Sequence, residues 1–401
     1  MSTLVFRKGL NLKAEVAGAL AHDYHSGIVD AIRAADHAYR SGRLTIHLAR
    51  EFGFCYGVER AVDYAYQTRR RFPDRRVFLT GEIIHNPHVN GKLRNAGIRF
   101  LSDPEERWDA LGPDDVVILP AFGLPVDEAK RLDDQGCVLV DTTCGSVLNV
   151  WKAVTRYARD GFTSVIHGKV RHEETRATAS QALTYPEGHY LIVLNCDETE
   201  DVCEFIRTGE GAARLLERFG AAASPGFDPE IHMARVGLAN QTTMLMSESL
   251  RVEDLFRQAM RDRYGDAALD AHFRAFDTIC SATQDRQDAV VTLLDTEPLD
   301  LMIVIGGYNS SNTRNLARIC AERLPTYHVA DASCLLSAEE IRHRPGSHSQ
   351  ATPAGSSELV TDSSWLPAGP VRVGLTAGAS TPNNIIGETV ERLTQLTQLT
   401  Q

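Results

Sequence analysis

The chain has 401 residues, which is enough for two or three domains and a large hydrophobic core. Hydrophobic residues make up 43% and charged residues 24%, as in ordinary globular proteins, and no apolar run is long enough to span a bilayer. The net charge of −11 argues against nucleic acid as a partner. The eight cysteines show no close pairing, so we expect a reducing, cytoplasmic setting in which some cysteines bind metal or react.

The first 43 residues need a separate interpretation. They lack the apolar core of a signal peptide, and they mix basic with acidic side chains, unlike a transit peptide. We interpret them as an N-terminal extension with a helix near Tyr24–Tyr39. Beyond it, short apolar runs predict strands, and helical patterns follow most of them; the strands are expected at 45–49, 77–79, 116–119, 138–140, 163–167, 191–194, 236–243, 301–305 and 371–375.

Strands that alternate with helices predict an α/β fold with parallel sheets. Three such units follow one another along the chain. We could not assign residues 195–235 to helices or strands. We expect an N-terminal extension (1–43), three α/β domains (44–144, 145–276 and 277–393) and a frayed tail (394–401). Residues 44–56 of the first domain are able to pack with the third. The third domain carries a surface insertion rich in Pro, Gly and Ser at 341–370.

Three cysteines stand where a strand-like run gives way to a helical pattern: Cys55, Cys144 and Cys280. The last two occur in nearly the same tetrapeptide, Asp-Thr-Thr-Cys and Asp-Thr-Ile-Cys. A helix N-terminus favours the thiolate, which is the form that binds metal. Three such cysteines could share one iron–sulfur cluster, although buried core cysteines and a zinc site remain open from the residues alone.

Polar side chains gather at the other expected strand ends. They are hydroxyl, amide, imidazole and carboxyl groups, and small hydroxyls and amides at helix starts suit an anionic phosphate. Each alone is a weak signal, because Ser and Asn are also ordinary helix caps and a lone histidine is usually structural or exposed. The set comprises His85, Asn86, His172, Glu174, Thr242, Thr243, Ser310, Ser311, Asn312 and Ser380.

Taken together, these motifs resemble the 4-hydroxy-3-methylbut-2-enyl diphosphate reductase family, which completes the non-mevalonate route to isoprenoids. The resemblance spans about Leu44 to Leu393. Within the family, the chain is similar to the longer cyanobacterial and plastid branch. It is carried by Gly53-Phe54-Cys55, Glu82-Ile83-Ile84-His85-Asn86, Asp141-Thr142-Thr143-Cys144, His172-Glu173-Glu174, Gln241-Thr242-Thr243, Thr278-Ile279-Cys280-Ser281, Asn309-Ser310-Ser311-Asn312 and Thr376-Ala377-Gly378-Ala379-Ser380.

The resemblance implies three small α/β domains in a pseudo-threefold trefoil around a central [4Fe-4S] cluster held by Cys55, Cys144 and Cys280. The substrate hydroxyl would bind the open iron and leave as water after two electrons and two protons are added. The products would be isopentenyl and dimethylallyl diphosphate. Glu174, relayed by Thr242, would supply a proton.

The resemblance also implies a diphosphate site and a redox partner. The diphosphate would contact His85, Asn86, His172, Thr243, Ser310, Ser311, Asn312 and Ser380. The sequence has no flavin or nicotinamide motif, so we expect a ferredoxin-like or flavodoxin-like electron donor, with no nucleic acid and no membrane as partner.

One residue departs from the family pattern, and two other functions remain open. Many members have His where this chain has Phe122, so the diphosphate site lacks one donor. The first alternative is a cluster-containing hydro-lyase that uses the open iron without net electron transfer. The second is a non-enzymatic binding module stabilised by a metal such as zinc.

Overall fold

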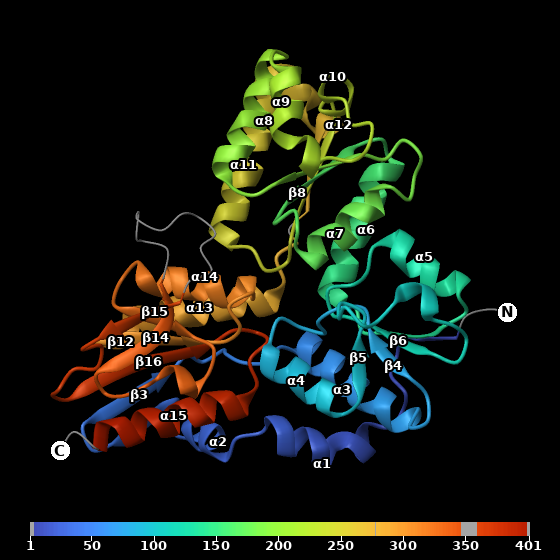
Figure 1. Cartoon of the computed structure of the whole chain (residues 1–401). Helices are drawn as coiled ribbons and strands as arrows, with labels where there is room; N and C mark the ends of the chain where they lie inside the picture. Colours follow the sequence, from blue (N-terminus) through green and yellow to red (C-terminus); the bar gives the residue numbers. More distant parts are fainter. Residues whose placement is uncertain (1–3, 277, 346–358, 399–401) are drawn as a thin grey trace. The chain divides into compact units, whose positions relative to one another are not determined.

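A computed structural model describes residues 4–276, 278–345 and 359–398. The chain folds into two compact units. The first unit contains Met1–Arg7 and Arg107–Cys280, and the second contains Lys8–Glu106 and Ser281–Gln401. In the described part, helices flank mostly parallel strands, so the predicted α/β class is confirmed (Figure 1).

Two groups of parallel strands form the first unit. In one, β7 (Val138–Asp141) lies between β1 (Val5–Phe6) and β6 (Val116–Leu119), and α5 (Val126–Asp134) and α6 (Gly145–Arg159) precede and follow β7 in the chain. All four β6 residues are buried, as expected for a parallel strand covered on both faces. In the other group, the strand order is β11 (Phe273–Ala275), β10 (Val236–Asn240), β8 (Thr163–His167) and β9 (Tyr190–Val193).

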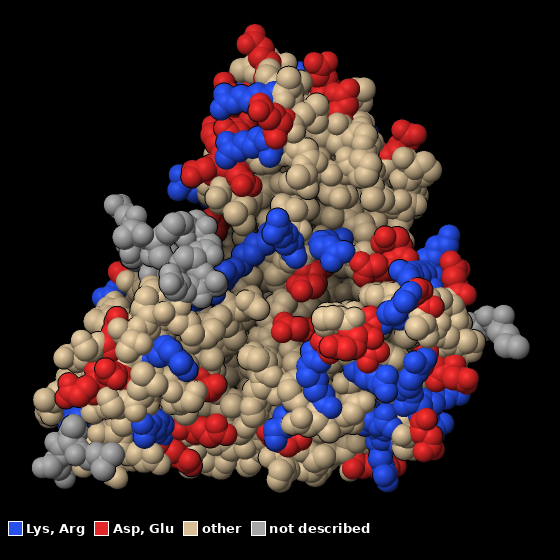
Figure 2. Space-filling model, viewed as in Figure 1, with Lys and Arg blue, Asp and Glu red and all other residues tan. Residues whose placement is uncertain are grey.

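Helices cover the second of these groups. They include the three that the sequence left unassigned, α8 (Cys196–Thr208), α9 (Ala212–Phe219) and α10 (Pro229–His232), together with α7 (Glu173–Ala182), α11 (Met246–Tyr264) and α12 (Leu269–His272). Acidic and basic side chains are interspersed over α8, α9 and α11 in Figure 2. Arg207 is paired with Glu200 and Asp262 there, so charges of both signs face the solvent.

The second unit is built on a seven-stranded sheet. Its four central strands are parallel, and the edge strands are antiparallel. The order is β15 (Val360–Ser363), β14 (Glu340–Pro345), β13 (Thr326–Val329), β12 (Leu301–Ile305), β16 (Val371–Ala377), β3 (Leu44–Leu48) and β2 (Ala38–Ser41). A parallel pair, β4 (Val77–Leu79) and β5 (Ile98–Phe100), belongs to the same unit.

Seven helices pack in the described part of this second unit. A large apolar core joins the sheet to α2 and α15, and a smaller one joins it to α13 and α14. The helices are α1 (Lys13–Tyr24), α2 (Gly27–Ala34), α3 (Tyr56–Arg71), α4 (Pro87–Asn95), α13 (Ser281–Thr296), α14 (Ser311–Ala321) and α15 (Asn383–Gln398). Among the described residues, no helix combines the length and the apolar character needed to cross a membrane.

The structure differs from the sequence predictions at both ends of the chain. The expected helix near Tyr24–Tyr39 is instead α2 followed by β2, because Asp36 and His37 adopt positive φ angles of 51° and 62° that end the helix. The expected frayed tail continues α15 as far as Gln398. Residues 346–358 of the predicted surface insertion lie outside the described residues. Asp277, the first residue of the Asp-Thr-Ile-Cys motif, also lies outside them.

Candidate functional site

Cys144 is held at the start of α6 by backbone hydrogen bonds to the end of β6. The Cys144 N–H donates to the carbonyl of Ala121 at 3.0 Å, two residues beyond the last residue of that strand. Two residues earlier, the N–H and Oγ1–H of Thr142 both donate to the carbonyl of Leu119, at 3.2 and 2.6 Å. The segment after β7 therefore continues the parallel pairing past the strand end and fixes the Cys144 backbone.

Cys280 has the same arrangement beside β10. Its N–H donates to the carbonyl of Thr242 at 3.2 Å, two residues beyond the strand end at Asn240. Oγ1 of Thr278 donates to the carbonyl of Asn240 at 3.2 Å and accepts the N–H of that residue at 2.6 Å. The repeated Asp-Thr-x-Cys pattern thus has a structural meaning, because its threonine binds the last residue of the neighbouring strand.

Cys55 shows this arrangement a third time, beside β16. The N–H of Gly53 donates to the carbonyl of Ala377, the last strand residue, and that of Cys55 donates to the carbonyl of Ala379, both at 3.2 Å. Gly53 has a φ of 71°, which a glycine adopts without strain. The buried Arg286 donates to the Gly53 carbonyl at 2.7 and 3.2 Å, a stabilising contact that sequence reasoning missed.

Solvent exposure separates these three cysteines from most of the others. The three at helix starts are partly exposed, whereas Cys137, Cys203, Cys320 and Cys334 are buried. Burial raises the pKa of Cys320 to about 12 and also raises the pKa of Cys203 and that of the partly exposed Cys196. Thiols with raised pKa values stay protonated and are poor metal ligands.

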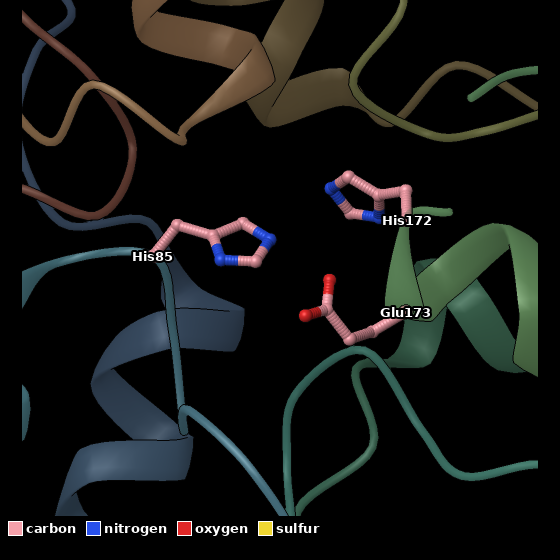
Figure 3. Close-up of side chains that lie close together, drawn as sticks. All are labelled: His85, His172 and Glu173. Carbon is pink, nitrogen blue, oxygen red and sulfur yellow. The ribbon is translucent and has the colours of Figure 1, made fainter. Parts of the chain in front are cut away.

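His172 caps the start of α7, where Glu173 also begins the helix (Figure 3). The His172 Nδ1 accepts the N–H of Glu174 at 3.2 Å, so in the neutral ring the proton is on Nε2 and Nε2 is a hydrogen-bond donor. Phe122 meets the imidazole edge to face, with ring centroids 5.6 Å apart. Phe122, where the resemblance implied a histidine, therefore lies directly against a predicted substrate ligand.

Glu174 is a buried carboxyl group joined to Thr242. The residue is 2% exposed, so an ionised carboxylate needs hydrogen bonds to offset the loss of water. Oε1 accepts the N–H of Thr242 at 2.6 Å, and Oε2 accepts the Thr242 hydroxyl at 3.0 Å. Because Thr242 also accepts the Cys280 N–H, the structure brings the two predicted catalytic residues together beside that cysteine.

Gln241 was named only within a motif, yet it positions three groups around this carboxyl. Its Oε1 accepts the Thr175 hydroxyl and the N–H of Lys169, each at 3.1 Å. Its Nε2 donates to Oγ1 of Thr243, a predicted substrate ligand, at 2.8 Å. The residue is 1% exposed. A buried amide whose partners lie in distant segments leaves no recognisable pattern in a single sequence.

In the second unit, Ser310, Ser311 and Asn312 form the first turn of α14. Oγ of Ser310 accepts the N–H of Thr313 at 3.2 Å as the helix cap. Oδ1 of Asn312 accepts the N–H of Ala379 at 3.0 Å. Among the described residues, the buried Nδ2 of Asn312 has no hydrogen-bond partner, so it is available to an acceptor such as a phosphate oxygen.

Ser380 and His85 meet next to this turn. Oγ of Ser380 donates to the backbone carbonyl of His85 at 3.2 Å. The approach requires glycines, since a Cβ at Gly307 would lie 2.5 Å from that carbonyl and one at Gly378 would lie 1.9 Å from Oγ1 of Thr313. The structure therefore brings Ser310, Asn312, Ser380 and His85 together at the carboxyl ends of β12 and β16.

His85 and Asn86 occupy the loop that leads into α4 rather than a strand end, because β4 stops at Leu79. Figure 3 shows the His85 side chain projecting from this loop. Nδ1 of His85 is 2.9 Å from Oε2 of Glu82, which orients the ring. Oδ1 of Asn86 accepts the N–H groups of His88 and Val89 at 3.0 and 3.2 Å. The Asn86 oxygen is thus used as a helix cap, and only its amide NH₂ remains suited to an anion.

The fold and these sites define the general class of the protein. Three cysteines, one histidine and a buried carboxyl group lie at helix starts that follow parallel strands: Cys55, Cys144, Cys280, His172 and Glu174. In open α/β sheets the carboxyl edge of the strands is the usual position of an active site. The chain is therefore an α/β protein with the architecture of an enzyme.

Comparison with known proteins then gives the family. The family model described as LytB protein matches residues 46–394, so the chain belongs to the LytB family. A relative from Gloeobacter violaceus named 4-hydroxy-3-methylbut-2-enyl diphosphate reductase is 49% identical over 98% of this chain and 92% of its own length. A Synechococcus relative of the same name (strain RCC307) is 47% identical over 98% of this chain and 94% of its own. The predicted family is confirmed.

Two solved structures have a similar fold. One is a structure of (E)-4-hydroxy-3-methyl-but-2-enyl diphosphate reductase, called the terminal enzyme of the non-mevalonate pathway. It is 27% identical, with a TM-score of 0.51 over 87% of this chain and 99% of its own. The other is the corresponding reductase from Plasmodium falciparum, 21% identical, with a TM-score of 0.60 over 87% of both chains. Both agree with the fold that the resemblance implied.

Proposed function

We propose that the chain reduces 4-hydroxy-3-methylbut-2-enyl diphosphate to isopentenyl and dimethylallyl diphosphate. One observation carries this proposal: Cys55, Cys144 and Cys280 share one pattern of backbone bonds that leads from a strand end into a helix. The names of the relatives supply the substrate. In the net reaction, one carbon–oxygen bond breaks, two electrons and two protons are consumed, and the oxygen leaves as water.

The three cysteines would hold a [4Fe-4S] cluster. They fit this group because they are partly exposed thiols at helix starts, whereas the protonated, buried thiols of Cys203 and Cys320 do not. When bound, such a cluster supplies electrons singly and an iron that acts as a Lewis acid. The electrons would come from a ferredoxin-like or flavodoxin-like donor in the cytoplasm.

Glu174 would hold the proton that goes to the leaving oxygen. In the ionised state the Thr242 hydroxyl donates to Oε2 of Glu174. When Glu174 is protonated, this hydrogen bond can reverse, and the Thr242 hydroxyl can then pass its own proton toward the substrate. Protonation matters because hydroxide is a poor leaving group and water is a good one. Because both residues are buried, bulk water is kept from exchanging protons with them during this transfer.

The diphosphate would be bound by hydrogen-bond donors. The buried Nδ2 of Asn312 and the amide of Asn86 can each donate to a phosphate oxygen. Nε2 of His172 and the hydroxyl of Thr243 would also donate. The remaining proposed ligands, which are small hydroxyls and one imidazole, are Ser310, Ser311, Ser380 and His85.

The test is turnover of anaerobically purified full-length protein with its cluster loaded. The substrate is added with a chemical one-electron reductant, and both five-carbon diphosphates are measured by mass spectrometry. We expect product formation that requires the reductant and a visible absorption band that fades on reduction. Substrate consumption without reductant would instead indicate the hydro-lyase. A colourless, zinc-containing protein without turnover would indicate the binding module.

A further inference from the structure

A cavity of about 560 Å³ lies in the second unit, on the side of α3 that faces the N-terminal extension. It is lined by the loop before α1, by α1 and α2, and by the first three turns of α3. Its volume is within the range of small-molecule pockets. None of its lining residues belongs to the proposed cluster or diphosphate ligands, although Phe54 and Tyr56 flank Cys55 in the chain.

One part of the cavity wall is aromatic. It is formed by Tyr24, Phe54, Tyr56 and Tyr64, together with Leu20. The rings of Tyr24 and Phe54 pack with centroids 5.6 Å apart, whereas Tyr56 is 82% exposed. Exposed aromatic surface next to packed aromatic surface favours the binding of a flat or apolar organic group.

The cavity is also cationic, although the chain as a whole has a net charge of −11. Lys8 and Lys13 are exposed, and neither has an ion-pair partner within the described ranges of the chain. Arg60 lies 4.8 Å from the centroid of the Tyr64 ring, which directs its charge along the aromatic wall. Four cations and two carboxylates line the pocket in total: Lys8, Lys13, Arg33 and Arg60 against Glu59 and Asp63.

The loop that carries the two lysines is fixed before any ligand arrives. Oε1 of the buried Gln67 accepts the N–H groups of Leu10 and Leu12 at 3.0 and 3.1 Å. Gly9, with a φ of 81°, packs so closely on Tyr64 that a Cβ would lie 3.0 Å from the ring. Asn11 also has a positive φ, of 62°. A rigid loop lowers the entropic cost of holding Lys8 and Lys13 around an anion.

We propose that this cavity binds an organic phosphate with a hydrophobic or aromatic body. Its phosphate would lie between Lys8, Lys13 and the arginines, and its body against the tyrosines. The site is distinct from the proposed diphosphate site and does not depend on the proposed reaction. Two sources share this chemistry, a prenyl diphosphate and a nucleotide, and separate probes distinguish them.

Isothermal titration calorimetry on the cluster-loaded full-length protein tests the proposal. The probes are geranyl diphosphate, adenosine 5′-monophosphate and inorganic pyrophosphate. We expect one of the two organic probes to bind at least about tenfold more tightly than pyrophosphate, because only the organic probes contact the aromatic wall. The double variant Lys8→Glu/Lys13→Glu should weaken that binding by roughly tenfold or more, since two charged contacts become repulsive.

Two controls locate the binding. Lys152→Glu reverses an exposed lysine on α6 in the first unit, and His172→Ala alters the proposed substrate site; both should leave the affinity of the organic probe unchanged. Binding that His172→Ala abolishes, or that the double lysine variant leaves intact, would overturn the proposal by placing the probe elsewhere. Absence of binding by both organic probes, or equal binding of pyrophosphate, would overturn it as well.

Discussion

Glu174 and His172 are two residues apart at the start of α7, and their hydrogen bonds give them different tasks. Nδ1 of His172 accepts the N–H of Glu174, which leaves Nε2 as the donor. Both carboxylate oxygens of Glu174 are instead directed at Thr242. One helix start can therefore present a donor for an anion and, beside it, an acid for proton transfer.

Replacing Glu174 with Gln tests the proposed acid. Gln keeps the shape and can still accept the N–H of Thr242, but it has no acidic proton. We expect turnover to fall by roughly 10²–10⁴, the usual contribution of general acid catalysis. Iron content and substrate affinity should stay close to those of the unaltered chain. Steady-state reduction with a chemical one-electron donor is the measurement, and turnover within a few-fold would exclude this role.

His172→Ala should weaken substrate binding by about 1.5–3 kcal/mol, the range for a hydrogen bond to a charged group. Alanine also removes the helix cap, so His172→Asn is the matched control, because Asn caps well but lacks the imidazole donor. Both variants should bind the substrate more weakly in calorimetry. Phe122→His, beside the same ring, should tighten binding by adding a donor. An unchanged dissociation constant in both His172 variants would place the diphosphate elsewhere.

At the scale of elements, strand-end hydrogen bonding recurs before α3, α6 and α13. In each case the cysteine N–H donates to a carbonyl two residues past the end of the neighbouring strand. The residue two positions before the cysteine binds the last strand residue. Such bonds tie the cysteine backbone to a buried parallel strand and hold it in place. A loop without these bonds would leave the cysteine less firmly positioned.

Comparing Thr278→Val with Thr142→Val tests this strand-end bonding. Valine keeps the shape of threonine and removes only the hydroxyl. Thr278→Val leaves the N–H and carbonyl of Asn240 unpaired, so it should cost about 2–4 kcal/mol of unfolding free energy. Thr142→Val should cost about 0.5–1.5 kcal/mol, because the Thr142 backbone N–H still binds Leu119.

Denaturant unfolding measures these two costs, and hydrogen exchange at the Asn240 amide reports the lost contact directly. We expect that amide to exchange faster in Thr278→Val and to keep its protection in Thr142→Val. Equal unfolding free energies for the two variants, with unchanged exchange at Asn240, would show that the threonine hydroxyl does not fix the segment before Cys280.

At the scale of the whole molecule, the sequence predicted most strands and the α/β class well. Buried parallel strands are continuous apolar runs, and Val116–Leu119 and Leu301–Ile305 were recognised for that reason. The helices α8 to α10 were missed. The division into domains 44–144, 145–276 and 277–393 stays a prediction.

Long-range contacts limited the prediction of the candidate sites. Arg286 binds the carbonyl of Gly53, 233 residues away, and nothing local marks it. Gln67 fixes the loop before α1 through backbone N–H groups, which carry no sequence signal. The orientation of His172 toward Phe122 likewise depends on packing. Residue types could be predicted from motifs, but the partners that orient them could not.

The most direct measurement of the central claim is iron and acid-labile sulfide per chain after anaerobic reconstitution of four variants. Cys55→Ser, Cys144→Ser and Cys280→Ser should each lose most of their iron, because each removes one proposed ligand. Cys137→Ser should keep the iron content of the unaltered chain, since Cys137 is a buried thiol with a raised pKa. Near-normal iron in any of the first three, or its loss in Cys137→Ser, would contradict the ligand assignment.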